Sequence, residues 1–350
     1  MKQRNLIPIS LLVWGLLALF AVATSSADDN IVPRKITTIT IPGNLPHFDI
    51  SWVDSASETY YLADRTSTPG TGRVEVIDAE HDTFLYSITG FVGNAGSGLS
   101  GPDGVLVIHK RNELWAGDGD STVKVVDLAT GSVVTSIPTG GDHRADELAY
   151  DPVDQVILVA NDRDAVPFVT FISVETRTVL GHISYPQATA GLEQPVWDQQ
   201  RHRFYMSVPA TVANPNGEVD EINPKTESVT NVFPITTPCG PAGLALLPGQ
   251  RLMTSCGVVL DARTGATLAT IAGVSGDEIW YNPGDNRVYF GNQPIFVVDA
   301  TSCQVVASVD AGDTHSLAAN SENNHIFVPV TGVRVVAHAG DEDQEGHGKK

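Results

Sequence analysis

Basic residues, cysteines and long apolar runs are all scarce in this sequence of 350 residues. Lysine and arginine together number 21 against 41 aspartates and glutamates, which gives a formal net charge of -20. Because binding to nucleic acid or to an anionic membrane surface needs a basic surface, we expect neither as a partner. The same charge suits a metal ion or another cationic ligand, and it also suits plain solubility.

Motifs that define several enzyme classes are missing as well. The sequence contains no G-x-S-x-G nucleophile elbow, no H-E-x-x-H zinc motif and no phosphate-binding loop, so we expect no nucleotide cofactor. The spacing of the three cysteines fits neither a zinc site nor a c-type haem motif. Only His47 and His315 are candidates for axial haem ligands, and we therefore expect no haem.

One long apolar run lies at the start of the chain. Residues 6–23 follow a charged beginning that contains Lys2 and Arg4, and small residues precede Asp28. This order is typical of a secretory signal peptide, so we predict that residues 1–27 are removed on export, with an uncleaved anchor as the alternative. Removal of the two cations lowers the formal charge to -22. We expect the mature chain to be secreted or periplasmic, monomeric and without a membrane span.

A pattern of two short apolar strands joined by a polar turn recurs along the rest of the chain. Its clearest copy has strands at residues 148–150 and 156–160 on either side of an Asp-Pro turn. Seven copies begin at Asp49, Gly104, Glu147, Gln194, Gly243, Glu278 and Ser316. Repeats of roughly 40–50 residues with several short strands are typical of propeller blades. We therefore predict an all-β fold, a seven-bladed β-propeller of four-stranded blades, over residues 28–337.

The two ends of the repeat region complement one another. Residues 35–42 (KITTITIP) predict a single strand with no partner before it, whereas the last copy supplies three strands and lacks a fourth. We predict that the N-terminal strand completes the last blade and closes the ring, because closure removes exposed sheet edges. The tail at residues 338–350 is acidic and has few apolar side chains to bury, so we expect it to be disordered.

Two of the three cysteines fall at the same end of one repeat. Cys239 precedes the first strand of the fifth copy, and Cys256 follows its second strand. In an exported chain this placement predicts a disulfide between them, and it leaves Cys303 unpaired.

One segment resembles a known repeat. Residues 120–137 (DSTVKVVDLATGSVVTSI) combine a short polar lead, alternating valines, an aspartate and a Thr-Gly turn. They resemble the YVTN-type repeat of YncE-like proteins, and similar turns recur at residues 261–265 and 299–302. The resemblance implies a seven-bladed propeller in an exported bacterial or archaeal protein. It implies no particular activity, since propellers carry many unrelated functions.

The predicted fold brings one position of every repeat to the mouth of a central channel, because the inner strands of a propeller start there. Four of these residues are predicted metal ligands: Asp146, Glu193, Asp277 and His315. Their side chains suit Ca²⁺, Mg²⁺, Mn²⁺ or Zn²⁺, and converging carboxylates repel one another unless a cation, a proton or a donor compensates. Seven further residues are predicted to contact a ligand: His47, Asp103, Arg144, Glu147, Asn161, Gln194 and Glu278.

Three interpretations of this acidic mouth remain open. The first is a propeller that binds a small molecule, a metal ion or a protein partner there. The second is a metal-dependent hydrolase or lyase, since gluconolactonase-type propellers hold a divalent ion with residue types that Glu193, Asn161 and Asp277 supply. That family's motif order and its usual six blades are not reproduced. In the third, the aspartates only accept hydrogen bonds from loop amides and hold the blades together. No catalytic residue is predicted.

Overall fold

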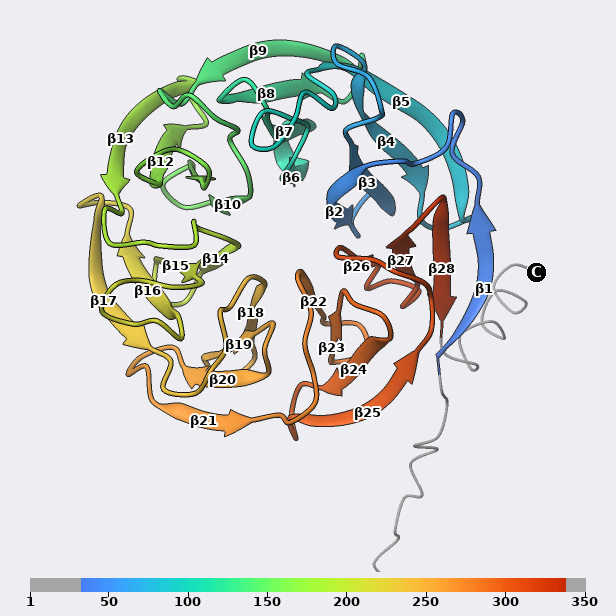
Figure 1. Cartoon of the computed structure of the whole chain (residues 1–350). Coiled ribbons are helices and arrows are strands. Elements are labelled where there is room, and N and C mark those ends of the chain that lie inside the picture. Colours follow the sequence, from blue (N-terminus) through green and yellow to red (C-terminus); the bar gives the residue numbers. More distant parts are fainter. Residues whose placement is uncertain (1–32, 338–350) are drawn as a thin grey trace, which may run out of the picture. The chain divides into compact units, whose positions relative to one another are not determined.

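The computed structural model describes residues 33–337, which form a ring of seven antiparallel sheets with four strands each (Figure 1). This arrangement confirms the predicted seven-bladed β-propeller. In six blades the strands follow chain order from the channel outward, so the first strand of each repeat is the innermost. The predicted signal peptide, residues 1–27, and the predicted tail, residues 338–350, lie outside the described residues. Between residues 33 and 337, no helix is both long and apolar enough to cross a bilayer.

The strands are numbered in chain order, and blade 7 alone combines both ends of the series. Blade 1 contains β2 (Phe48–Asp54), β3 (Thr59–Asp64), β4 (Gly72–Asp78) and β5 (Thr83–Phe91). Blade 2 contains β6 (Val105–Ile108), the short 3-10 helix η1 (His109–Arg111), β7 (Glu113–Asp118), β8 (Thr122–Asp127) and β9 (Ser132–Pro138). Blade 3 contains β10 (Leu148–Asp151), β11 (Val156–Asn161), β12 (Phe168–Ser173) and β13 (Thr178–Ser184).

The remaining blades repeat this plan. Blade 4 contains β14 (Pro195–Asp198), β15 (Arg203–Val208), β16 (Glu218–Asn223) and β17 (Ser228–Pro234). Blade 5 contains β18 (Leu244–Leu247), β19 (Arg251–Thr254), β20 (Val258–Asp261) and β21 (Thr267–Thr270). Blade 6 contains β22 (Ile279–Asn282), β23 (Arg287–Phe290), β24 (Ile295–Asp299) and β25 (Gln304–Val309). Blade 7 contains β26 (Ala318–Ala319), β27 (Ile326–Pro329), β28 (Val333–Ala337) and β1 (Arg34–Ile39).

The turn between the first two strands of a blade relies on a short acceptor side chain. In blade 3, Oδ1 of Asp151 accepts hydrogen bonds from the amides of Val153 and Asp154 at 2.8 and 3.2 Å. Gln155 then adopts a left-handed conformation with a φ of 53°. Asp198 accepts the equivalent bonds in blade 4. Because Asp and Asn make these local bonds readily, one of them opens this turn in most copies.

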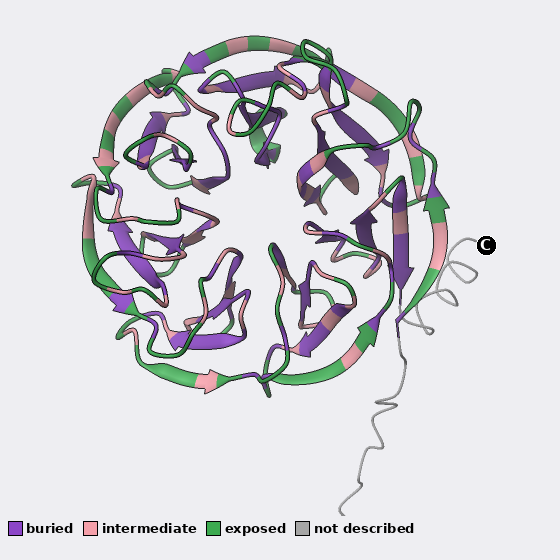
Figure 2. Cartoon of the chain, in the orientation of Figure 1, coloured by how far each residue is buried: buried purple, intermediate pink, exposed green. Residues whose placement is uncertain are grey.

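Hydrophobic side chains are buried between the blades. The described part of the chain contains seven buried hydrophobic clusters, with one cluster at each junction between neighbouring blades. Figure 2 shows the largely buried middle strands and the largely exposed outer strands. At the junction of blades 7 and 1, the rings of Tyr60 and Phe327 stack with centroids 4.9 Å apart. Each blade therefore needs a neighbour on both faces, which only a closed ring provides.

The N-terminal strand closes the ring as predicted. β1 pairs antiparallel with β28, from Arg34 opposite Ala337 to Ile39 opposite Val333, and forms the outer strand of blade 7. The strand is shorter than the predicted residues 35–42, because the chain leaves the sheet after Ile39. One blade is thus built from both ends of the described chain.

Space is tightest where the inner strands start. A Cβ atom on Gly104 would lie 2.5 Å from the carbonyl oxygen of Asp146, and one on Gly243 would lie 2.4 Å from that of Asp277. These distances are too short for any side chain, so glycine is required at both positions. Because the two aspartates are mouth residues, this close packing also fixes the backbone of the site.

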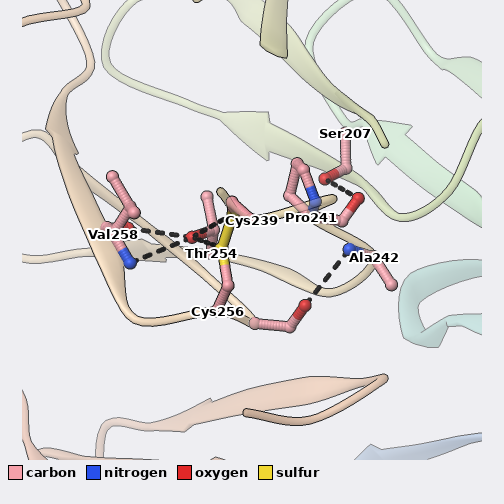
Figure 3. Close-up of a disulfide and its surroundings, with 8 residues drawn as sticks. Ser207, Cys239, Pro241, Ala242, Thr254, Cys256 and Val258 are labelled. Atoms are coloured by element: carbon pink, nitrogen blue, oxygen red, sulfur yellow. Dashed lines mark hydrogen bonds between the residues drawn. A yellow bond between two sulfur atoms is a disulfide. The ribbon is translucent and has the colours of Figure 1, made fainter. Parts of the chain in front are cut away.

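Cys239 and Cys256 form the predicted disulfide beside the inner hairpin of blade 5 (Figure 3). Their Cα atoms are 5.5 Å apart. Thr254 lies next to the bridge, and its hydroxyl accepts a hydrogen bond from the amide of Val258 at 3.1 Å. Cys303 is free and buried. The bridge therefore ties together the two segments that enter and leave the hairpin.

We expect loss of β1 to open the ring. A chain that begins at Gly43 should unfold at a clearly lower temperature than one that begins at Asp28, because the cluster between blades 7 and 1 loses Ile39 and one side of its cover. Ile39→Ala alone should cost about 2–5 kcal/mol in urea unfolding. Thr38→Ala, on the exposed face of the same strand, should stay within about 0.5 kcal/mol. Equal melting temperatures for the two chain lengths would contradict the role of β1.

Loss of the disulfide should also lower stability. The double variant Cys239→Ala/Cys256→Ala should lose about 3 kcal/mol in urea unfolding according to the chain-entropy account of cross-links. A thiol reductant should destabilise the parent protein and leave the double variant unchanged. Thiol titration of the denatured, unreduced protein should detect one free thiol, that of Cys303; a count of three would show that the bridge does not form.

Candidate functional site

Four mouth residues share one backbone hydrogen bond. The amides of Asp103, Asp146, Glu193 and Asp277 each donate to a carbonyl at the end of the second strand of their own blade, at distances between 2.8 and 3.1 Å. This bond extends the inner hairpin by two residues before β6, β10, β14 and β22. Because the bond recurs in each blade, equivalent side chains reach the same end of the channel, as the repeat pattern predicts.

Three buried carboxylates meet on the side of the mouth formed by blades 1 to 3. Asp49, Asp103 and Asp146 each place an oxygen within 4.8 Å of the other two, and none is more than 8% exposed. Arg65 donates to Asp49 and Asp103, and Arg144 lies 2.5 Å from Asp146 and 3.4 Å from Asp103. Two guanidinium groups therefore offset part of the repulsion among the three converging carboxylates. We call these five residues the arginine-aspartate cluster.

Arg144 is the most heavily bonded member of the cluster. Its Nε and Nη2 atoms donate to the two oxygens of Asp162 at 3.0 and 2.9 Å, a bidentate pair. Asp162 follows β11, and its Oδ2 atom also forms an ion pair with Nε of Arg163 at 2.8 Å. Each of the three guanidinium nitrogens of Arg144 thus contacts a carboxylate. Arg144, a predicted ligand contact, therefore pairs with carboxylates of the protein itself.

Burial and ion pairing act in opposite directions on the cluster. Burial disfavours the ionised form of Asp49, but Arg65, a hydrogen bond from His315 and Arg144 together outweigh it and hold its pKa well below the usual range. At Asp103, burial prevails over the same two arginines and raises its pKa well above the usual range. One carboxylate is therefore held ionised while its neighbour is pushed towards the protonated form, which limits their repulsion.

Three residues at the mouth, Arg65, Asp49 and Asp162, are not among the site residues that the repeat pattern predicts. Arg65 follows β3 and Asp162 follows β11, so both stand at the ends of second strands, on the same rim as the residues before the inner strands. Asn161, a predicted ligand contact, ends β11, and Arg65 and Asp162 each stand one residue after the end of a second strand. Asp49 opens the first copy and lies one residue after the mouth position.

Glu193 and Asp277 belong to the other side of the mouth and differ from the cluster. Glu193 is partly exposed and Asp277 is exposed to solvent. Within residues 33–337, neither carboxylate has a hydrogen-bond or ion-pair partner. Burial, followed by the charges of Asp146 and Asp277, raises the pKa of Glu193 to about 9. The pKa of Asp277 is raised too, mainly because the surrounding protein limits its hydration. These two carboxylates lack the compensation that the arginines give their neighbours.

His315 lies between the two sides of the mouth. Its Nε2 atom is 3.5 Å from Oδ1 of Asp49, and its ring stacks on Phe48 with centroids 4.5 Å apart. Burial disfavours its charged form, but the hydrogen bond to Asp49 and the charges of Asp49 and Asp277 outweigh burial and raise the pKa of His315. Of the four predicted metal ligands, only Asp146 belongs to the compact carboxylate triad of the cluster.

The other predicted contacts occupy different depths. His47 is exposed on the rim. Asn161 is buried, and its amide donates to Thr139 and accepts from Thr170. Gln194 uses Oε1 to accept the amide of Leu244 in the next blade at 2.6 Å. Glu147 and Glu278 lie deeper in the channel, where they are buried and hydrogen-bonded to each other.

A polar cavity of about 310 Å³ opens beside the arginine-aspartate cluster. It is bounded by the loop after β5, in which Gly93, Gly96 and Gly98 have positive φ values of 77°, 107° and 72°. The side chains that line it include His47, Arg65, Asn94, Ser97, Ser100, Arg144 and Arg163. Hydrogen-bond donors therefore face one half of the mouth, and the uncompensated carboxylates face the other.

No family model and no curated protein matches this sequence. Solved structures do match, 1438 chains in all. One is a chain of the "Crystal Structure of Mitotic Checkpoint Complex", with a TM-score of 0.68 over 94% of this chain and 99% of that chain, at 13% sequence identity. At this identity the likeness shows the fold alone, and a fold shared so widely does not select a function.

The raised pKa of Glu193 predicts a specific pH dependence. The folded protein holds this proton more tightly than the unfolded chain, so its contribution to stability falls as the pH rises from the ordinary value of 4.5 towards about 9. Glu193→Gln removes the titration. In urea unfolding, the variant should gain stability relative to the parent with rising pH, by at most about 1.4 kcal/mol per pH unit.

Glu175→Gln, on an exposed turn of blade 3, is the matched control and should show no such trend. Parallel stability curves for the parent and the Glu193 variant would contradict this account of the mouth.

Proposed function

We propose that this chain is an exported propeller of the YVTN type that binds a polar ligand with a cationic group at the mouth of its channel. One observation carries the proposal: Glu193 and Asp277 lie at the mouth without a hydrogen-bond or ion-pair partner among the described residues, next to carboxylates that pair with Arg65 and Arg144. A cation between them would favour their ionised forms and remove the repulsion that raises their pKa values. The channel mouth would thus gain stability from binding.

The arginine-aspartate cluster is not the proposed cation site. Its carboxylate triad has the oxygen ligands that a divalent ion prefers, but Arg65 and Arg144 already use those oxygens. A metal ion there would have to displace a guanidinium group. We therefore assign the cation to Glu193 and Asp277, with His315 beside them, and treat the cluster as a fixed wall.

The neighbouring polar cavity extends the proposal to a second group on the ligand. Arg163 uses Nε for Asp162 and is 53% exposed at its side chain, and the charge of Arg163 also acts on Asp277. A ligand whose cationic group binds Glu193 and Asp277 would reach Arg163, His47 and the serines with an acceptor group. Amino acids, peptides and cation-bridged anions have this combination of groups.

Export is supported by the disulfide, because such bridges persist mainly in oxidising compartments. The YVTN-type repeat is supported by the Asp-led outer turns. Asp127 and Asp261 accept hydrogen bonds from amides two residues later at 2.9 and 2.8 Å. We propose no catalytic role. Asn161, which would complete a gluconolactonase-type ligand set, has its amide bonded to Thr139 and Thr170.

The test is thermal unfolding in the presence of separately titrated Ca²⁺, Mg²⁺, Mn²⁺ and Zn²⁺, and of arginine as an organic cation with a carboxylate. A bound ligand at about 100 times its Kd should stabilise the protein by about 2.7 kcal/mol. Glu193→Gln and Asp277→Asn should each abolish the shift, because each removes one of the two unpaired charges. Binding should tighten towards about pH 9, because the cation competes with the proton on Glu193.

Glu175→Gln again serves as the control and should keep the full shift. If none of these ligands raises the melting temperature, or if the shift survives in both mouth variants, the two carboxylates are solvated surface groups and the proposed function is wrong.

A further inference from the structure

The channel contains a second cavity, of about 400 Å³, below the mouth. Its wall consists of the inner strands β2, β6, β10, β14, β18 and β22, and it extends to Pro152 in the turn after β10, at the opposite end of these strands. Most of the lining side chains are apolar. Five of them are large aromatic residues: Trp52, Tyr150, Trp197, Trp280 and Tyr281. A cavity of this size suits a small organic molecule.

Blade 7 makes room for two of these rings. Its inner strand β26 consists of Ala318 and Ala319 alone. Trp52 of blade 1 and Trp280 of blade 6 therefore approach each other and meet edge to face, with ring centroids 5.3 Å apart. Both tryptophans remain partly exposed. Their packing fixes part of an aromatic wall that a ligand can contact without rearranging the blades.

The end of the cavity nearest the mouth carries a buried acid. Glu147 lines the cavity and is 5% exposed. It is hydrogen-bonded to Glu278, which is 4% exposed and belongs to blade 6. No lysine, arginine or histidine forms an ion pair with either carboxyl group in the part of the chain that the structure describes. Burial and the neighbouring carboxylates raise the pKa of both groups well above the usual range, so a cation beside them would favour their ionised forms.

We propose that this cavity binds an organic amine, with the ammonium group at Glu147 and the apolar portion against the aromatic wall. An ammonium group would favour ionisation of the pair, with which no cation of the described residues forms an ion pair, and the faces of the tryptophans and tyrosines attract cations as well. A carboxylate ligand would add a further negative charge beside these buried acids and be repelled. A neutral ligand of equal length would gain only the apolar contacts. The site is separate from the mouth and does not depend on the proposed function there.

Three ligands of equal chain length test the charge requirement. Octylamine, 1-octanol and octanoate are titrated into the protein at neutral pH while tryptophan fluorescence is followed, since three tryptophans line the cavity. Octylamine should saturate at one molecule per chain and bind at least about tenfold more tightly than octanol. Octanoate should bind most weakly. Equal binding of all three, or no saturable binding of the amine, would overturn the proposal.

Two variants locate the site. Glu147→Gln keeps the size of the side chain and removes the charge, so the preference for octylamine over octanol should fall to less than about threefold. Val196→Trp, on β14, should fill the cavity and weaken both ligands. The Val196 variant tests the location of the binding site even if the Glu147 variant fails to fold. A preference that persists in Glu147→Gln, or affinities unchanged in Val196→Trp, would overturn the assignment.

Glu193→Gln provides the control at the mouth. It should keep the preference for octylamine over octanol, although the charge it removes also acts on Glu147 and Glu278, while abolishing the response to the ligands of the mouth. The two proposals can therefore fail independently of one another.

Discussion

Each blade of this protein has two apolar faces, and only neighbouring blades can cover them. The buried clusters at the seven junctions show that the hydrophobic core is divided evenly around the ring. A gap at any junction would expose two apolar faces at once. The pairing of β1 with β28 therefore stabilises the whole ring as well as the last blade. The mouth and the channel cavity exist because the ring closes, since their walls consist of side chains from six or seven blades that are far apart in sequence.

The negative charge of the carboxylates along the channel is offset in a different way at each position. In the arginine-aspartate cluster, Arg65 and Arg144 provide fixed positive charge. At Glu193 and Asp277, no cation among the described residues forms an ion pair, and the nearby positive groups do not prevent the rise of either pKa. At Glu147 and Glu278, burial raises both pKa values and favours protonation instead. Because burying an ionised group without a partner is costly, the position with the weakest compensation is the one most responsive to a bound cation.

The repeat pattern predicted the blades, the closing strand and the disulfide because these depend on periodicity and on backbone position alone. It also brought Asp103, Asp146, Glu193 and Asp277 to one rim. It could not predict the direction or partners of side chains. Arg65 reaches the cluster from the strand next to the innermost one, and Asn161 bonds within its own blade and to blade 2. Trp52 packs at a junction between blades and also lines the cavity, and the repeat pattern does not separate these two roles.

The pairing of Arg34 with Ala337 has a mechanical consequence. The two ends of the described chain leave the ring side by side, at the same end of two antiparallel strands. Ladder hydrogen bonds lie across the strands, so a force that pulls these ends apart acts along the bonds and breaks them one after another, as a zipper opens. The ring would yield first at its own seam and only afterwards release the blades, each of which is a continuous hairpin series. A load applied within one blade would instead have to shear several bonds together.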